Sequence, residues 1–151
     1  MRPVTEKGKK WYEILLWVLI GATVLGIWSL SLRSAGSSTQ QSNAVAMPVI
    51  IGGGFRGEWF SYVVVLVRKL AHFAEFGVLG VWWGLYGQRR WLPCMWLYGL
   101  AVALMDEGIQ YFVPGRAPGF WDVVIDYGGF FCGFALVFTV AEWWIRKKSK
   151  K

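Results

Sequence analysis

The residues of this chain that could perform chemistry lie in two charged inserts within otherwise apolar sequence. Residues 68–76, RKLAHFAEF, carry the only histidine, His72, together with Glu75. Residues 106–129 carry four carboxylates, a glutamine and an arginine. Histidine and carboxylates can exchange protons, ligate an ion or contact a polar headgroup. Such groups are costly in apolar surroundings unless they face one another, so both inserts are candidates for a functional site.

The composition indicates a small membrane protein of one domain. Of the 151 residues, 56% are hydrophobic and eleven are tryptophan, well beyond the apolar content of soluble domains. The net charge of +7 does not predict a nucleic-acid partner, because the lysines and arginines gather at the chain ends and in one short loop. Membrane topology explains this distribution better.

Four apolar segments, residues 11–32, 59–86, 92–112 and 121–145, are each long enough as helices to cross a hydrocarbon core of about 30 Å. Residues 59–86 are longer than one crossing needs. We place residues 59–66 at the interface and residues 67–86 across the membrane, with one strongly tilted helix as the alternative. The predicted fold is an all-α membrane protein, a bundle of four transmembrane helices.

The remaining segments flank or connect these helices. Residues 1–10 form a basic leader, and residues 146–151 form a basic tail. Residues 33–58 are rich in Ser, Gln, Asn and Gly, which predicts a flexible extracytoplasmic loop, and residues 59–145 form one domain with the three later helices. The AVA sequence within this loop is typical of signal-peptide processing, but the first apolar segment is too long and ends too early for cleavage there.

The distribution of lysine and arginine predicts the orientation. Alternating spans place the leader, the turn before residue 91 and the tail on one side, with four, two and five of these residues. The opposite loops hold three. The positive-inside rule therefore predicts a multi-pass protein of the cell membrane with both termini in the cytoplasm.

This topology brings the two charged inserts to one level in the outer half of the membrane. Helical spacing also places their polar residues on common faces at i, i+3 and i+4. Gly129 and Gly133 lie on the side that carries two of the carboxylates and would let another helix approach closely. The residues that we expect to meet in one pocket are Lys69, His72, Glu75, Glu107, Gln110, Arg116, Asp122 and Asp126.

Three motifs, RKLAHFAEFGVLG, DEGIQYFVPGR and WDVVIDYGGFFCG, together resemble the VanZ-like family of membrane proteins. The resemblance covers residues 68–133. Phe76 stands where the family usually has tyrosine, and Asp126 stands where asparagine is common. The resemblance implies a small multi-span bacterial membrane protein with a role in the cell envelope, since the founding member is linked to resistance against the glycopeptide antibiotic teicoplanin.

We expect the pocket to bind the headgroup of an envelope lipid or a lipopeptide. Arg116, Lys69 and His72 would contact the ligand. Glu107, Gln110 and Asp122 would hold these three side chains in position. The expected partners are membrane lipids, including a lipid-linked envelope precursor or a lipoglycopeptide.

Two alternatives remain open. The first is a membrane-embedded hydrolase or transferase on a lipid-linked substrate, with His72 and Glu107 or Asp122 as acid and base. The absence of a reactive serine or cysteine in the cluster argues against covalent catalysis. The second is a network that only holds the helices together.

No cofactor or metal is predicted. A metal ion would draw on His72, Glu75, Glu107 and Asp122, but the HxxE spacing is not a zinc-protease signature and no carboxylate spacing specifies a metal site. Cys94 and Cys132 lie in separate apolar segments, and we expect both to be buried free thiols.

Overall fold

The protein is helical throughout the part described by the computed structural model, which comprises residues 6–33, 35–53, 58–88, 94–116 and 119–149. This confirms the all-α prediction. The five helices are α1 (Glu6–Ser31), α2 (Ala35–Gly53), α3 (Glu58–Gly87), α4 (Met95–Tyr111) and α5 (Phe120–Ser149).

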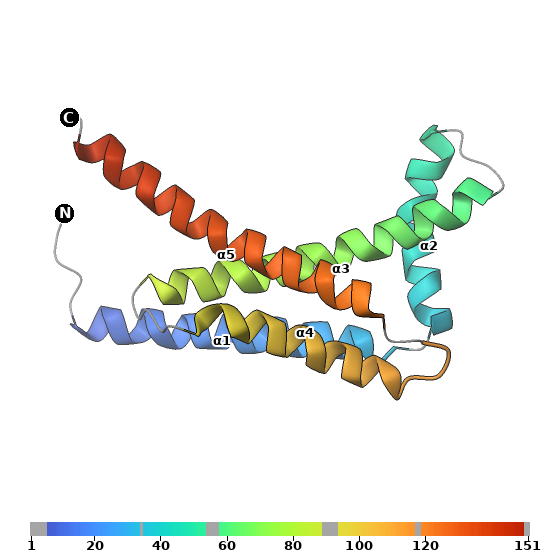
Figure 1. The fold of residues 1–151 in the computed structure, drawn as a ribbon, viewed down its shortest axis with the longest axis horizontal. Coiled ribbons are helices and arrows are strands. Elements are labelled where there is room, and N and C mark those ends of the chain that lie inside the picture. Colours follow the sequence, from blue (N-terminus) through green and yellow to red (C-terminus); the bar gives the residue numbers. More distant parts are fainter. Residues whose placement is uncertain (1–5, 34, 54–57, 89–93, 117–118, 150–151) are drawn as a thin grey trace.

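Helices α1, α3, α4 and α5 run in alternating directions and form a bundle (Figure 1). The start of α1, the end of α3, the start of α4 and the end of α5 point toward one end of the molecule. The end of α1, the end of α4 and the start of α5 lie toward the opposite end, where α2 crosses the first half of α3. Arg116, which follows α4 by a few residues, therefore lies at this second end.

The core of the bundle is formed by apolar residues that recur every three or four positions, as a helix that buries one face requires. The buried residues of α1 and α3 are Leu16, Ile20, Val24, Ile27, Phe76, Leu79, Trp83 and Tyr86. The ring of Trp83 stacks on Tyr98 with centroids 4.0 Å apart, and its Nε1 donates a 2.8 Å hydrogen bond to the carbonyl oxygen of Met95. These contacts join α3 to the start of α4.

Helices α3 and α5 cross in backbone contact because both carry glycine at the crossing. A Cβ atom added to Gly129 would collide with the carbonyl of Phe73, and one added to Gly133 would collide with the carbonyl of Gly77. The close approach expected of Gly129 and Gly133 is therefore confirmed. The crossing also fixes which site residues of α3 and α5 face each other, because Phe73 directly follows His72 and Gly129 lies one helical turn after Asp126.

The prediction of a flexible loop between the first two apolar segments is wrong for residues 35–53, which form α2. Ser42, Ala46 and Ile50 recur at intervals of four and are buried, and Ala46 and Ile50 pack with Val64 of α3. This apolar stripe gives the helix a partner despite its polar composition and its internal Pro48. Whether α2 lies outside the cytoplasm remains a prediction.

Two helices are long and apolar enough to cross a membrane among the described residues, Lys10–Ser31 and Phe120–Ser149. Only 28% of the most apolar window of each is buried within the protein, and several large apolar side chains, such as Leu25 of α1 and Leu136 of α5, are exposed. Helix α3 carries Arg68, Lys69 and Glu75 in its middle, and α4 has 17 residues. Of the four predicted spans, α1 and α5 are candidates among the described residues, and the crossing of the membrane by α3 and α4 remains a prediction.

The two cysteines correct a second expectation. Cys94 and Cys132 are free, as predicted, but both are exposed on the surface of the protein. Cys132 lies on the outer side of α5, because its neighbour Gly133 faces α3 and consecutive helical residues point about 100° apart.

Candidate functional site

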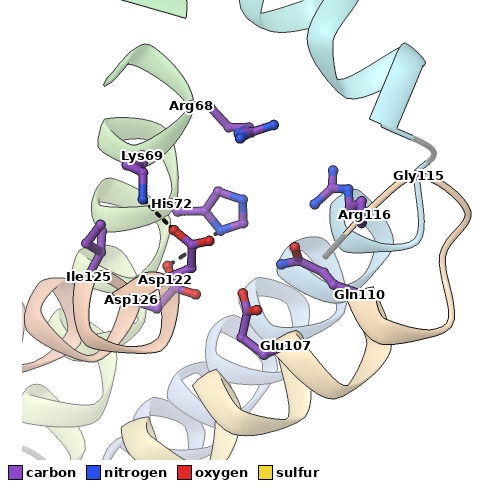
Figure 2. A pocket seen from close by; sticks show the side chains of 10 residues that line it. All are labelled: Arg68, Lys69, His72, Glu107, Gln110, Gly115, Arg116, Asp122, Ile125 and Asp126. Carbon is purple, nitrogen blue, oxygen red and sulfur yellow. Dashed lines mark hydrogen bonds and ion pairs between the residues drawn. The ribbon is translucent and has the colours of Figure 1, made fainter. Parts of the chain in front are cut away.

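A polar cavity of about 240 Å³ opens between α3, α4 and α5 at the end of the bundle that carries the turn after α4 (Figure 2). Helix α3 contributes basic side chains and the histidine, α4 a carboxylate and an amide, and α5 two carboxylates. Its lining residues are Arg68, Lys69, His72, Glu107, Gln110, Gly115, Arg116, Asp122, Ile125 and Asp126. We call this cavity the polar pocket.

An ion pair closes one side of the polar pocket. Lys69 Nζ lies 2.6 Å from Asp122 Oδ1 and joins the middle of α3 to the first turn of α5. Asp122 is also well placed near the positive end of the α5 dipole. This pairing occupies the charge of Lys69, so Lys69 is not a free cation for a ligand.

His72 and two buried carboxylates form the floor of the site, and each comes from a different helix. His72 Nδ1 lies 3.5 Å from Asp126 Oδ1, which is too long for a strong hydrogen bond. One ring nitrogen of His72 and one carboxylate oxygen each of Asp106 and Asp126 all lie within 4.8 Å of one another. Asp106 and Asp126 are 0% and 1% exposed, so both carboxylates are removed from bulk water.

Helix α4 orders the turn and the buried carboxylate. Glu107 Oε2 accepts a 2.8 Å hydrogen bond from the backbone N–H of Gly119, which ties the turn before α5 to α4. One turn further, Gln110 Nε2 donates a 2.9 Å hydrogen bond to Asp106 Oδ2. Gly115 makes the turn possible because its φ is 79°, a conformation that favours glycine.

Arg68 and Arg116 extend toward each other at the mouth of the polar pocket (Figure 2). Neither guanidinium pairs with a carboxylate within the part of the chain that the structure describes, and Arg116 Nε is buried without a hydrogen-bond acceptor. Burial lowers the pKa of Arg116, and repulsion from Arg68 lowers it further. Arginine nevertheless stays charged, so two like charges share one opening.

The structure brings seven of the eight expected site residues to the polar pocket. Glu75 is the exception, because it lines a neighbouring cavity of about 150 Å³ between α3, the end of α1 and the middle of α2. His72 pairs with Asp126 rather than with Glu75.

Sequence reasoning did not include Arg68 or Asp106 among the site residues. Both were visible in the sequence, since Arg68 lies four residues before His72 and Asp106 lies four residues before Gln110. Residues at that spacing share a helix face.

The fold and this site define a class of protein: a helical membrane protein with apolar outer surfaces and a cluster of charged groups at one end of its bundle. Neither a curated protein nor a solved structure matches the chain significantly. The family model VanZ/LLP1 matches residues 12–142. The chain belongs to the VanZ/LLP1 family, and the match extends the resemblance of residues 68–133 to α1 and α2.

Proposed function

We propose that this protein is a multi-pass protein of the cell membrane that binds the anionic headgroup of an envelope lipid in the polar pocket. In this proposal α1, α3, α4 and α5 cross the bilayer, and both termini are cytoplasmic. The two charged ends of the chain and the turn before α4 then lie on the inner side, as the positive-inside rule requires. The polar pocket opens toward the outer leaflet.

The single observation that carries the ligand assignment is that the guanidinium groups of Arg68 and Arg116 face each other and pair with no carboxylate among the described residues. Two cations in a partly buried opening repel each other, and a shared anion removes this repulsion. Arginine forks bind phosphate and carboxylate oxygens in a bidentate manner, with hydrogen bonds stronger than those between neutral groups. A phosphate between Arg68 and Arg116 would also supply the missing acceptor for Arg116 Nε.

The position of the pocket favours a lipid over a free anion. Val65 is exposed and lies one helical turn before Arg68 and Lys69 on α3, and Ile125 lines the cavity itself, so apolar surface adjoins the polar opening. A lipid can place its headgroup between the arginines while its chains remain along this surface. The cavity also has room for a headgroup. Its volume of about 240 Å³ is several times the volume that one water molecule occupies in the liquid, which is about 30 Å³.

Binding can be tested with the full-length protein in detergent and short-chain phosphatidylglycerol, with short-chain phosphatidylcholine as the zwitterionic comparison. We expect saturable binding of the anionic lipid and a loss of at least tenfold in affinity in the Arg68→Gln and Arg116→Gln variants. Arg146→Gln is the matched control, because Arg146 is exposed in the last turn of α5 and pairs only with Glu142 among the described residues. Equal affinity for both lipids in the unmodified protein would refute the proposal.

A second candidate function is hydrolysis or group transfer on a lipid-linked substrate. The observation that favours it is the position of His72, which lines the polar pocket with Asp126 beside its Nδ1, as a general base requires an orienting carboxylate. Incubation of the purified protein with envelope lipids, followed by mass spectrometry, separates the two functions. A binding protein returns the lipids unchanged, whereas an enzyme returns a product that disappears in the His72→Gln variant.

A further inference from the structure

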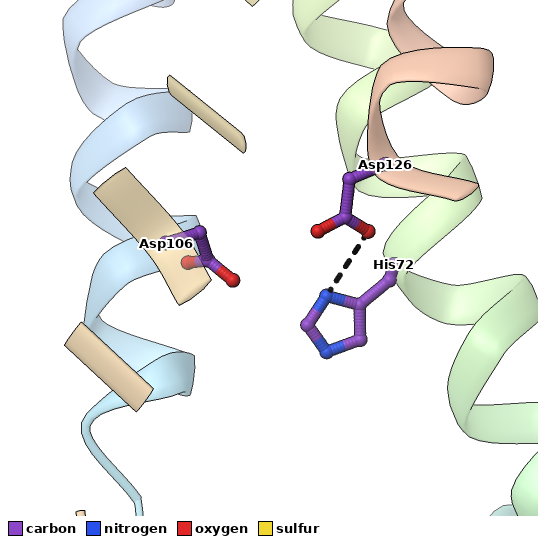
Figure 3. Close-up of side chains that lie close together, drawn as sticks. All are labelled: His72, Asp106 and Asp126. Atoms are coloured by element: carbon purple, nitrogen blue, oxygen red, sulfur yellow. Dashed lines mark ion pairs between the residues drawn. The ribbon is translucent and has the colours of Figure 1, made fainter. Parts of the chain in front are cut away.

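We propose that His72, Asp106 and Asp126 bind a divalent transition-metal ion beneath the polar pocket. The three residues come from α3, α4 and α5, and their carboxylates point into the space between these helices (Figure 3). This inference goes beyond the proposed lipid binding and does not depend on it. It also differs from the set considered from the sequence, since only His72 is shared.

The geometry is close to that of a metal site. The candidate ligand atoms lie within 4.8 Å of one another. Bonds from a metal to nitrogen or oxygen are about 2.0–2.2 Å, so two ligands on opposite sides of an ion lie about 4.2 Å apart. Small side-chain rotations would therefore bring all three ligands to bonding distance without movement of the helices.

Three carboxylate oxygens of this cluster accept no hydrogen bond within the described residues, and this second observation points to a ligand. Asp106 Oδ1 and both oxygens of Asp126 are buried and accept no hydrogen bond from the described residues. Buried carboxylates are normally hydrogen-bonded or paired, because an unpaired ionised oxygen is costly away from water. Two such groups that face each other across a few ångströms create the negative potential that a cation would neutralise.

The other carboxylates of the site already hold a partner through one oxygen, although Glu107 Oε1 accepts no hydrogen bond from the described residues. Asp122 is paired with Lys69, and Glu107 Oε2 accepts the Gly119 N–H. Gln110 donates to Oδ2 of Asp106, and Oδ1 accepts no hydrogen bond from the described residues. A hydrogen bond that orients a ligating carboxylate in this way is the usual support of a metal ligand.

The donor set indicates the kind of ion. Magnesium, calcium and manganese prefer oxygen ligands, whereas an imidazole nitrogen suits zinc, copper, iron and nickel. Two carboxylates would balance the charge of a divalent ion. His72 and Asp126 also line the polar pocket, so an ion at this position would have an open side toward a bound anion.

The experiment uses the full-length protein in detergent. The protein is purified through an affinity tag that contains no histidine and is then freed of metal with a chelator. Zinc content is then measured after incubation and removal of excess ion, and cobalt is titrated with its visible absorption as the readout. We expect one ion per chain and a cobalt band whose intensity saturates with one equivalent.

The variants Asp106→Asn and Asp126→Asn keep the shape of the side chains and should weaken binding at least tenfold. Glu75→Gln is the matched control: it lies near His72 on the same helix, outside the cluster, and should bind as the unmodified protein does. Helical circular dichroism and size-exclusion elution confirm that each variant is folded. Absence of stoichiometric metal in the unmodified protein would overturn the proposal, as would unchanged binding in both aspartate variants.

The two arginine variants distinguish this proposal from lipid binding. Arg68→Gln and Arg116→Gln should lose affinity for anionic lipid and retain the metal. If these variants retain stoichiometric cobalt, the metal site stands whether or not the lipid proposal fails. If they lose cobalt while remaining folded, the three assigned ligands are not sufficient and the metal proposal is overturned.

Discussion

Lys69 Nζ lies 2.6 Å from Asp122 Oδ1, an ion pair that links the middle of α3 to the first turn of α5. The two side chains are 34% and 41% exposed, so water screens the interaction. Exposed ion pairs typically contribute less than about 1 kcal/mol to stability, whereas breaking a buried pair costs about 3–5 kcal/mol. The pair therefore serves to shape the pocket more than to stabilise the bundle.

We expect Lys69→Met and Asp122→Asn each to lower the free energy of unfolding by no more than about 1 kcal/mol. A double-mutant cycle by thermal or denaturant unfolding in detergent gives the coupling energy. A coupling above about 3 kcal/mol would show that the pair is desolvated and structural.

The glycines of the α3–α5 crossing give a sharper stability prediction. Gly129→Ala and Gly133→Ala place a methyl group against backbone carbonyls of α3, which cannot move away as a side chain would. We expect each variant to lose about 2 kcal/mol or more, comparable to overpacking of a core. Thermal unfolding followed by tryptophan fluorescence measures the loss.

Two other glycines provide matched controls for this prediction. A methyl group on Gly77 would lie 3.6 Å from the carbonyl oxygen of Gly129, an ordinary contact, and one on Gly108 of α4 would meet no atom within 4 Å. Alanine at either helical position should be neutral or stabilising by up to about 1 kcal/mol, because glycine loses more backbone entropy on folding. Equal losses at Gly77 and Gly129 would contradict the assigned crossing geometry.

The helix content and the convergence of the charged inserts could be predicted from the sequence. Apolar segments of sufficient length define α1 and α5, and alternation of direction places the middle of α3, the end of α4 and the start of α5 together. Spacing of three and four residues then selects the faces that carry Lys69 and His72 on α3 and Asp122 and Asp126 on α5. These inferences need only helix geometry, which is regular.

Features that depend on rotation about helix axes could not be predicted in this way. The partner of His72 is one example, because the glycine crossing fixes the register of α5 on α3 and so brings Asp126 to His72. The same limit explains Cys132, whose exposure depends on which side of α5 faces outward. Helix α2 was missed for another reason: the content of Ser, Gln, Asn and Gly outweighed the stripe of Ala46 and Ile50.

The hydrogen bond from the Gly119 N–H to Glu107 predicts a localised effect on dynamics. Glu107→Ala removes the acceptor and should increase hydrogen exchange of the Gly119 amide at least tenfold, which corresponds to about 1.4 kcal/mol and matches a bond to a charged group. Glu107→Gln keeps an oxygen at the same place and should restore most of the protection. Hydrogen–deuterium exchange with mass spectrometry of peptides that contain Gly119 provides the measurement.

A peptide from α1 serves as the internal control for this exchange experiment, because α1 lies outside the turn. An increase confined to the turn supports the assigned bond. A uniform increase in both peptides would show instead that the substitution destabilises the whole bundle.

The proposed orientation predicts the reactivity of the two free cysteines. Cys94 directly precedes α4 at the cytoplasmic end of the bundle, whereas Cys132 lies about 18 Å along α5 from its start and therefore near the middle of the bilayer. A membrane-impermeant maleimide should label Cys94 in inside-out vesicles and should not label it in intact cells. Cys132 should remain unlabelled in both until detergent is added, because a thiol within the hydrocarbon is out of reach of a polar reagent. The variants Cys94→Ser and Cys132→Ser assign each signal, and labelling of Cys94 from outside intact cells would reverse the orientation and place the polar pocket on the cytoplasmic side.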